Sequence, residues 1–216
     1  MIDLYSWKTS NGRKMTIMME ELGVEYRLHL VSLAKREQFS PEFTKINPNQ
    51  KIPAMVDQDG PGGKPYTVIE SGAMLFYLAE KYDKFLPHEP IPRYETIQWL
   101  FFQMGNIGPF FGQAHHFRRR EEKVPYGIER YTKETRRLWG VLNERLATRE
   151  YLNGDSYSIA DIATFPWTAR YEWQGISLDE FPNVKRWFEA IYARPAVKRG
   201  LDGVYDELLA QESQAR

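Results

Sequence analysis

Residues 1–84 alternate short apolar runs with amphipathic stretches, and the order of these segments restricts the fold more than any other feature of the chain. They are predicted as strand, helix, strand, short helix, strand, strand and helix, at residues 2–7, 11–22, 26–33, 41–46, 54–57, 66–69 and 71–82. A strand–helix–strand unit implies a parallel pair with a right-handed crossover, and the last two strands form a hairpin around the turn at 59–64. The pattern therefore predicts a mixed four-stranded sheet with helices packed on it.

This order is the thioredoxin-like arrangement, and we assign it to a domain at residues 1–84. Three prolines in residues 85–93 predict a stiff, extended linker. Residues 94–216 are expected to form an all-helical C-terminal domain, because apolar residues recur with the helical period there. The most regular stretches are 94–104, 126–146, 158–172 and 183–192.

The composition limits the kinds of partner that the protein attracts. The 29 basic residues equal the 29 acidic residues, so no long-range field draws in nucleic acid or an anionic membrane, and neither is expected as a partner. The first residues lack a basic and apolar leader, and no stretch approaches membrane-spanning length, which favours a cytoplasmic location. The chain has no cysteine, which excludes disulfides and a protein thiol nucleophile. Any sulfur chemistry must use a thiol carried by a ligand.

Two short segments predict a site for a small peptide. A cis bond at Ile52–Pro53 would place Ile52 at a sharp bend with its main-chain N–H and C=O turned outward, as an edge for an extended peptide. Glu70 and Ser71 close an apolar run and open a helix, which gathers a carboxylate, a hydroxyl and helix-terminal N–H groups. Ser71 is a favourable N-cap residue, yet Met74 stands where a capping box needs a carboxylate. These N–H groups are therefore expected to serve a ligand, although an ordinary helix cap is the alternative.

Motifs in a specific order along the whole chain resemble those of the cytosolic glutathione transferases. They are Thr-Ser-Asn-Gly-Arg-Lys at 9–14, Asn-Pro-Asn-Gln-Lys-Ile-Pro-Ala at 47–54, Glu-Ser-Gly at 70–72 and Tyr-Ser-Ile-Ala-Asp at 157–161. Residues 36–43 and 108–117 make the chain most similar to the bacterial Nu-class branch. Members of that branch act as glutathione-dependent disulfide-bond reductases, and they are similar to the globular domain of a fungal nitrogen-regulation prion protein.

The resemblance implies glutathione as the ligand and gives roles to the segments above. Ser71 would bind the γ-glutamyl carboxylate with its hydroxyl and N–H, and Glu70 would face the amino group. The main chain of Ile52, before Pro53, would pair with the cysteinyl part. The glycyl carboxylate would be reached by Gln38 and Lys51.

The resemblance also implies which donors stabilise the thiolate of bound glutathione. These are the hydroxyl of Thr9 and the amide of Asn11, with help from N–H groups at the start of the first helix. Both residues are alternatively turn and cap residues, because Asn-Gly is a strong turn signal. Tyr5 and Ser6 are candidates by residue type, since other branches use tyrosine or serine, but Tyr5 is expected to pack against the sheet.

The implied enzyme is a disulfide-bond oxidoreductase that uses glutathione as cosubstrate, with conjugation to electrophiles as a weaker activity. A non-catalytic glutathione-binding regulatory or scaffold module is the alternative, because fold alone does not separate the two. The family pattern further implies a homodimer in which Arg130 reaches glutathione bound to the other subunit, whereas a solvent-exposed ion pair is the simpler interpretation of this residue. No metal is expected, because His115 and His116 are adjacent rather than one helical turn apart.

Overall fold

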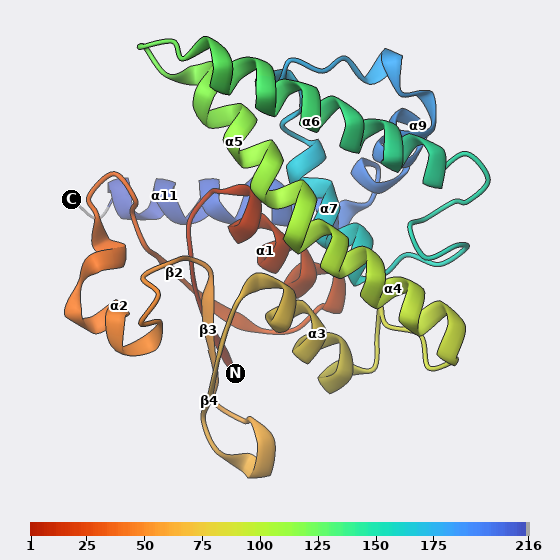
Figure 1. Ribbon diagram of the computed structural model, residues 1–216. Coiled ribbons are helices and arrows are strands. Elements are labelled where there is room, and N and C mark those ends of the chain that lie inside the picture. The colour runs from red at the N-terminus through yellow and green to blue at the C-terminus, as the bar shows by residue number, and fades with distance from the viewer. Residues whose placement is uncertain (215–216) are drawn as a thin grey trace. The chain divides into compact units, whose positions relative to one another are not determined.

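In the computed structural model, which describes residues 1–214, the N-terminal segments follow the predicted order of strands and helices (Figure 1). The chain divides into two compact units. The first contains residues 1–83 and the C-terminal segment from Arg194 on, and the second contains residues 84–193. The elements of the first 83 residues are β1 (Ile2–Ser6), α1 (Ser10–Leu22), β2 (Tyr26–Leu30), the 3-10 turn η1 (Glu37–Phe39), α2 (Pro41–Ile46), β3 (Ala54–Asp57), the turn η2 (Pro61–Gly63), β4 (Tyr66–Ile69) and α3 (Ser71–Tyr82).

The four strands form one sheet in the order β2-β1-β3-β4. β1 runs parallel to β2 and antiparallel to β3, and β3 runs antiparallel to β4. The predicted thioredoxin-like, mixed four-stranded sheet is therefore confirmed. Helix α1 ends as predicted, because Gly23 adopts the left-handed conformation with φ 68° that stops a helix.

The two faces of the sheet bury different side chains, because successive residues of a strand point to opposite faces. On one face Ser6 of β1 contacts the C-terminal segment, and on the other Tyr5 packs against Phe43 of α2. A small apolar cluster forms around Phe43, Val31 and Ala54, with Ile52 at its edge. These contacts on the two faces hold the segments that follow β1 and precede β3 against the sheet.

The second unit is helical, as expected. Its elements are α4 (Pro90–Phe102), a π-helical turn η3 (Gln103–Ile107), α5 (Gly108–Arg119), α6 (Pro125–Arg145), α7 (Ile159–Thr168), α8 (Tyr171–Gln174), the 3-10 turn η4 (Leu178–Glu180) and α9 (Pro182–Tyr192). The structure corrects the predicted linker at 85–93, because α4 already begins at Pro90. Proline is tolerated in the first turn of a helix, where its missing N–H has no helical partner.

A buried aspartate organises part of this helical unit. The carboxylate of Asp161 accepts hydrogen bonds from the N–H and hydroxyl of Ser158, the N–H of Leu152 and the indole N–H of Trp187. Ser158 and Asp161 also form a capping box at the start of α7. Burial raises the pKa of Asp161, and these four donors oppose that shift.

The end of the chain differs from the expected all-helical domain at 94–216. Residues after Arg194 form α10 (Pro195–Lys198), the π-helical turn η5 (Arg199–Gly203) and α11 (Val204–Gln214), and they pack with the sheet-containing unit. Arg13 of α1 donates from Nε to the carbonyl oxygen of Leu201 at 2.7 Å, and its Nη2 pairs with Asp202 at 2.5 Å. The segment thus supports the first helix. Among residues 1–214, no helix is long and apolar enough to cross a membrane.

Gly200 lies where η5 touches α1, and it yields a test of this packing. A Cβ atom there would lie 2.5 Å from the Cα atom of Ile17, so Gly200→Ala should lower the free energy of unfolding by about 1–3 kcal/mol in urea denaturation. Gly203→Ala is the matched control, because the nearest atom to its Cβ would be the Arg199 Cγ at 3.8 Å. Equal stability of the two variants would contradict the packing of the C-terminal segment on α1.

Candidate functional site

The register of the sheet brings the predicted site segments to one edge. Tyr5 at the end of β1 pairs with Ala54 at the start of β3, and Ala54 pairs with Ile69 at the end of β4. The chain therefore enters α1 after β1, enters β3 from Ile52, and enters α3 after β4, all at the same edge. Because β2 runs parallel to β1, the chain also leaves β2 at this edge, toward Gln38.

The start of α1 is capped by Thr9, whose hydroxyl oxygen accepts a hydrogen bond from the N–H of Gly12 at 3.1 Å. A hydroxyl that accepts in this way still has its own proton to donate. Asn11 lies in the first turn and is half-buried. That turn contains no acidic residue, so no carboxylate of the turn itself offsets the positive end of the helix. The arrangement suits an anion placed beside Thr9 and Asn11.

The corner between β1 and α1 is tightly packed. A Cβ atom on Gly12 would lie 2.1 Å from the carbonyl oxygen of Trp7 and 2.9 Å from the hydroxyl oxygen of Tyr205. The Ser6 hydroxyl forms a buried 2.8 Å hydrogen bond with Tyr205, whose pKa burial raises to about 12. Tyr5 stacks on His29 with ring centroids 4.5 Å apart, as the prediction of a packing role required. The side chains of Ser6 and Tyr5 therefore serve the packing of this corner and of the sheet.

The second segment approaches β3 through Ile52. The Ile52–Pro53 peptide bond is cis, and Pro53 is buried. Within residues 1–214 neither main-chain group of Ile52 forms a hydrogen bond, while its side chain packs on the cluster around Phe43. The exposed Lys51 is positioned by Asn47, a buried residue whose amide donates to the Lys51 carbonyl oxygen at 2.7 Å.

Gln38 lies in the 3-10 turn η1, at the edge where β2 ends. Its Oε1 atom is buried and has no hydrogen-bond partner within the described part of the chain. A buried acceptor without a partner costs free energy, and such atoms are typical of sites that bind a ligand or water. This observation agrees with the predicted ligand-binding role of Gln38.

The third segment begins α3, and here the structure corrects the predicted cap. Glu70, rather than Ser71, is the N-cap, and Ser71 is the first helical residue. Glu70 is exposed and has φ 67° and ψ 113°, a conformation that residues with a Cβ rarely adopt. The buried Ser71 hydroxyl accepts a hydrogen bond from Nζ of Lys14 at 3.2 Å. An exposed carboxylate thus stands beside a buried hydroxyl and ammonium.

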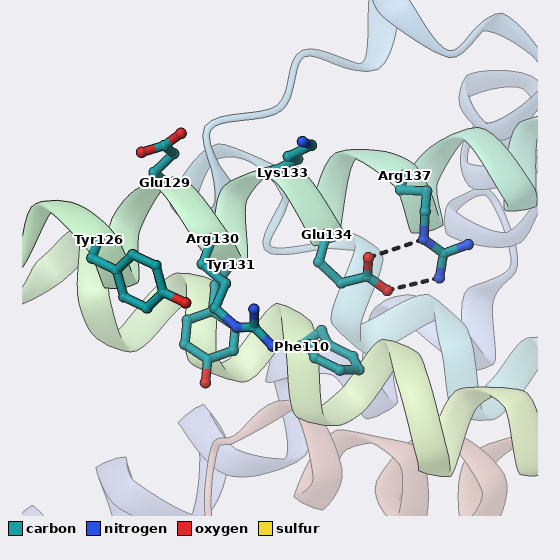
Figure 2. A pocket seen from close by; sticks show the side chains of 8 residues that line it. All are labelled: Phe110, Tyr126, Glu129, Arg130, Tyr131, Lys133, Glu134 and Arg137. Atoms are coloured by element: carbon teal, nitrogen blue, oxygen red, sulfur yellow. Dashed lines mark hydrogen bonds and ion pairs between the residues drawn. The ribbon is translucent and has the colours of Figure 1, made fainter.

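Arg130 lies on α6, in the second unit, while the other predicted site residues lie in the first. It is exposed, and it lines a pocket of about 480 Å³ between α5 and α6 (Figure 2). Figure 2 shows Glu134 of this pocket paired with Arg137. Arg130 appears in no ion pair of the described residues, but its charge helps to lower the pKa of Glu134 on the same helix, so both interpretations of this residue remain open.

The sequence-based site omitted Lys14 and Asn47. Lys14 lies one helical turn before Met18 and two before Leu22, on the same buried face of α1, and it is 1% exposed. An ionisable residue on a buried face is a signal that periodicity alone can reveal. No sequence pattern indicated the role of Asn47, because its hydrogen bond to the Lys51 carbonyl oxygen depends on the conformation of the loop between α2 and β3. Among the described residues, no group of three His, Asp or Glu side chains is placed to hold a metal ion.

The backbone conformation of Glu70 predicts an inverted effect of glycine on stability. Because φ is positive, removing the Cβ should relieve strain, so the free energy of unfolding of Glu70→Gly should exceed that of Glu70→Ala by about 1 kcal/mol, and Glu70→Gly should unfold at the higher temperature. Thermal unfolding of the two variants measures this difference. An alanine variant of equal or greater stability would contradict the positive φ of Glu70.

The sheet-containing and helical units correspond to two known domain families. Residues 1–80 match the N-terminal domain of glutathione S-transferase, and residues 113–195 match its C-terminal domain. Disulfide-bond oxidoreductase YfcG of Escherichia coli K12 is 51% identical over 93% of this chain and 94% of its own length.

Two solved structures of glutathione transferases are also similar. One, from Pseudomonas fluorescens with two glutathione molecules bound, is 49% identical with a TM-score of 0.89, over 93% of this chain and 92% of that one. The other, from Pseudomonas putida with one glutathione disulfide bound per subunit, is 44% identical with a TM-score of 0.89, over 93% and 90%. These matches confirm the family that the motifs predicted: the chain belongs to the glutathione S-transferase family.

Proposed function

We propose that the protein is a glutathione-dependent disulfide-bond oxidoreductase that uses the thiolate of bound glutathione. The observation that carries the proposal is the convergence, at one edge of the sheet, of a helix start with Thr9 and Asn11, the main chain of Ile52, and the buried Ser71 hydroxyl beside the exposed carboxylate of Glu70. These are the three features that a short peptide with a thiol and charged ends requires.

Each part of glutathione has a matching group at this edge. Ser71 would bind the γ-glutamyl carboxylate, and Glu70 the amino group, because a carboxylate is exposed beside a buried hydroxyl. The main chain of Ile52, before Pro53, would pair with the cysteinyl residue as an added strand. Gln38 and Lys51 remain for the glycyl carboxylate. The thiol would then face Thr9 and Asn11 at the start of α1.

The chemistry follows from stabilising the thiolate. Lowering a thiol pKa by about two units requires about 2.7 kcal/mol, and a hydrogen bond to a charged partner contributes about 1.5–3 kcal/mol. Two donors with the positive end of α1 are therefore sufficient. The thiolate attacks one sulfur of a disulfide, forms a mixed disulfide and releases the other half as a thiolate, which takes up a proton. A second glutathione thiolate attacks the mixed disulfide, and the products are glutathione disulfide and a second thiol. No metal takes part.

The relatives support this reaction. The similar E. coli protein bears the name disulfide-bond oxidoreductase, and the P. putida structure holds glutathione disulfide. We assign the chain to the Nu-class branch on its motifs at 36–43 and 108–117. A cytoplasmic location fits the proposed reaction, because the cytosolic glutathione pool is reducing.

We further propose a homodimer in which Arg130 reaches glutathione on the partner subunit. In support, Arg130 is exposed, lines the pocket on α6 and forms no ion pair within the described residues. Tyr126, which is 71% exposed, lines the same pocket and adds apolar area of the kind that interfaces bury.

Turnover should depend on Thr9 and Asn11. We expect Thr9→Ala and Asn11→Ala each to lower kcat/KM by about 10- to 100-fold, the factor that corresponds to one hydrogen bond to a charged sulfur. The measurement is a coupled assay with 2-hydroxyethyl disulfide, glutathione and glutathione reductase. Thr9→Ser, which keeps the hydroxyl, should retain most of the activity.

Tyr5→Phe is the matched control, since it removes a hydroxyl from a side chain that packs on His29. It should turn over at the wild-type rate. Loss of activity in Tyr5→Phe with unchanged activity in Thr9→Ala would refute the assigned donors. Glutathione binding without turnover in the wild type would instead favour the regulatory or scaffold module.

Arg130→Ala should weaken glutathione binding by about tenfold, the effect of one charge-assisted hydrogen bond, without dissociating the dimer. Calorimetric titration and light scattering measure the two properties. Lys133→Ala serves as a control, because Lys133 is exposed on the same helix and points away from Arg130 in Figure 2. Equal affinity of Arg130→Ala and wild type would remove Arg130 from the site.

A further inference from the structure

Three arginine side chains gather around α8, in the helical unit. The guanidinium carbons of Arg119, in the last turn of α5, and Arg170, at the start of α8, lie 3.9 and 4.2 Å from the centre of the Trp173 ring. The guanidinium group of Arg118 lies against the backbone at the other end of α8, since a Cβ atom on Gly175 would lie 2.3 Å from its Nη2 atom. Within the part of the chain that the structure describes, none of these three arginines forms an ion pair.

The ring on which two of these arginines lie is held in place. Trp173 packs edge-on against His115 with ring centroids 5.6 Å apart, and His115 also stacks on Trp167. The neighbouring Gln174 is fully buried, accepts from the Trp139 indole N–H at 2.6 Å and donates to the Trp167 carbonyl oxygen at 2.8 Å. A guanidinium group that stacks on an aromatic ring keeps its N–H edges available for an acceptor. The cluster therefore holds its donors in a set orientation.

The positive charges are close enough to repel one another. Two guanidinium carbons lie near the same ring, so their separation is no more than the two distances combined. Burial, and in addition the charge of Arg119, lower the pKa of His115 to about 4. Lys123 adds a further cation, since its Nζ donates to the Arg118 carbonyl oxygen at 2.8 Å. The negative end of α5 favours cations in its last turn, but this does not account for Arg170, which belongs to another segment.

The acidic residues of these segments do not balance the cluster. Glu122, which follows α5, pairs with Arg120 at 3.6 Å. Glu121 and Glu172 are exposed, and neither forms an ion pair with another residue of the described 1–214. The unpaired positive charges therefore outnumber the unpaired negative ones, and an anionic ligand would relieve their repulsion.

We propose that Arg118, Arg119 and Arg170 form a further ligand site, which binds the phosphate group of a phosphate monoester. Such a group carries close to two negative charges near neutral pH and offers three terminal oxygens as acceptors for guanidinium N–H groups. A carboxylate carries one charge on two oxygens, so it satisfies fewer of these donors. All residues of the site belong to the helical unit, and the inference does not depend on the proposed function.

The experiment measures phosphate binding by protein saturated with S-methylglutathione, which occupies the site proposed for glutathione. Broadening of the phosphorus resonance gives the affinity for methyl phosphate and for inorganic phosphate at constant ionic strength, and acetate serves as a singly charged competitor. We expect saturable binding of methyl phosphate, at least as tight as that of inorganic phosphate, and displacement by acetate only at concentrations about tenfold higher. Arg119→Ala and Arg170→Ala should each weaken the binding of methyl phosphate by at least about tenfold, the effect of one hydrogen bond to a charged group.

Arg120→Ala is the matched control, because this neighbouring arginine has its own carboxylate partner in Glu122. It should bind methyl phosphate as the wild type does. Trp173→Phe keeps an aromatic face and should retain most of the affinity, whereas Trp173→Leu should lose about as much as the arginine variants. Every variant should bind S-methylglutathione with wild-type affinity. Thermal unfolding identifies a variant that does not fold, and a lysine variant, which keeps the charge but loses the planar fork, then replaces it.

Several results would overturn the inference. One is the absence of saturable methyl phosphate binding in the wild type, including the case in which inorganic phosphate alone binds. Equal losses in Arg119→Ala and Arg120→Ala would show diffuse attraction by surface charge instead of a site. Weaker S-methylglutathione binding by folded Arg119→Ala and Arg170→Ala would assign the cluster to the glutathione site. A wild type that does not bind S-methylglutathione contradicts the proposed function, and the phosphate titration then tests the arginine site by itself.

Discussion

The structure of the site depends on the tight corner between β1 and α1. Gly12 lies so close to the Trp7 carbonyl oxygen and the Tyr205 hydroxyl that no larger residue fits without moving the chain. This contact fixes where the first turn of α1 begins, and Thr9 caps that turn through the N–H of Gly12. Tyr205 belongs to α11, near the C-terminal end of the chain. The C-terminal segment therefore helps to position the start of the first helix within the same unit.

The same corner explains how a chain without cysteine can carry out thiol chemistry. The protein contributes donors and a helix terminus, and the substrate contributes the sulfur. In the proposed function the site is divided between groups that would hold the peptide, such as Ile52 and Ser71, and groups that would act on its thiol. On that proposal a group that holds the ligand can be strained, as the backbone of Glu70 is, because the free energy of ligand binding would offset the strain.

Local patterns predicted the first unit well, because its signals are short-range. The helix at 41–46 and the strands at 54–57 and 66–69 have the predicted bounds, since proline, glycine and alternating apolar residues mark them within a few positions. Helix α5 lies within the region expected to be helical, but its bounds were not predicted; the chain continues into it from α4 through a π-helical turn. The packing of Gly200 on Ile17 depends on residues far apart in the sequence, which no local pattern reports. Thr9, Ile52 and Ser71 lie in short motifs and could be predicted as site residues. The contact between Lys14 and Ser71 joins residues far apart in the sequence and could not.

The central claim is that the start of α1 stabilises the thiolate of bound glutathione. The most direct test is an ultraviolet titration of the thiolate in the complex of the protein with glutathione, with the S-methylglutathione complex as blank. A thiol has an ordinary pKa of about 8.5, and the account predicts a value about two units lower in the complex. An unshifted pKa in saturated protein would contradict the account, because the donors at this helix start would then hold the ligand without activating it.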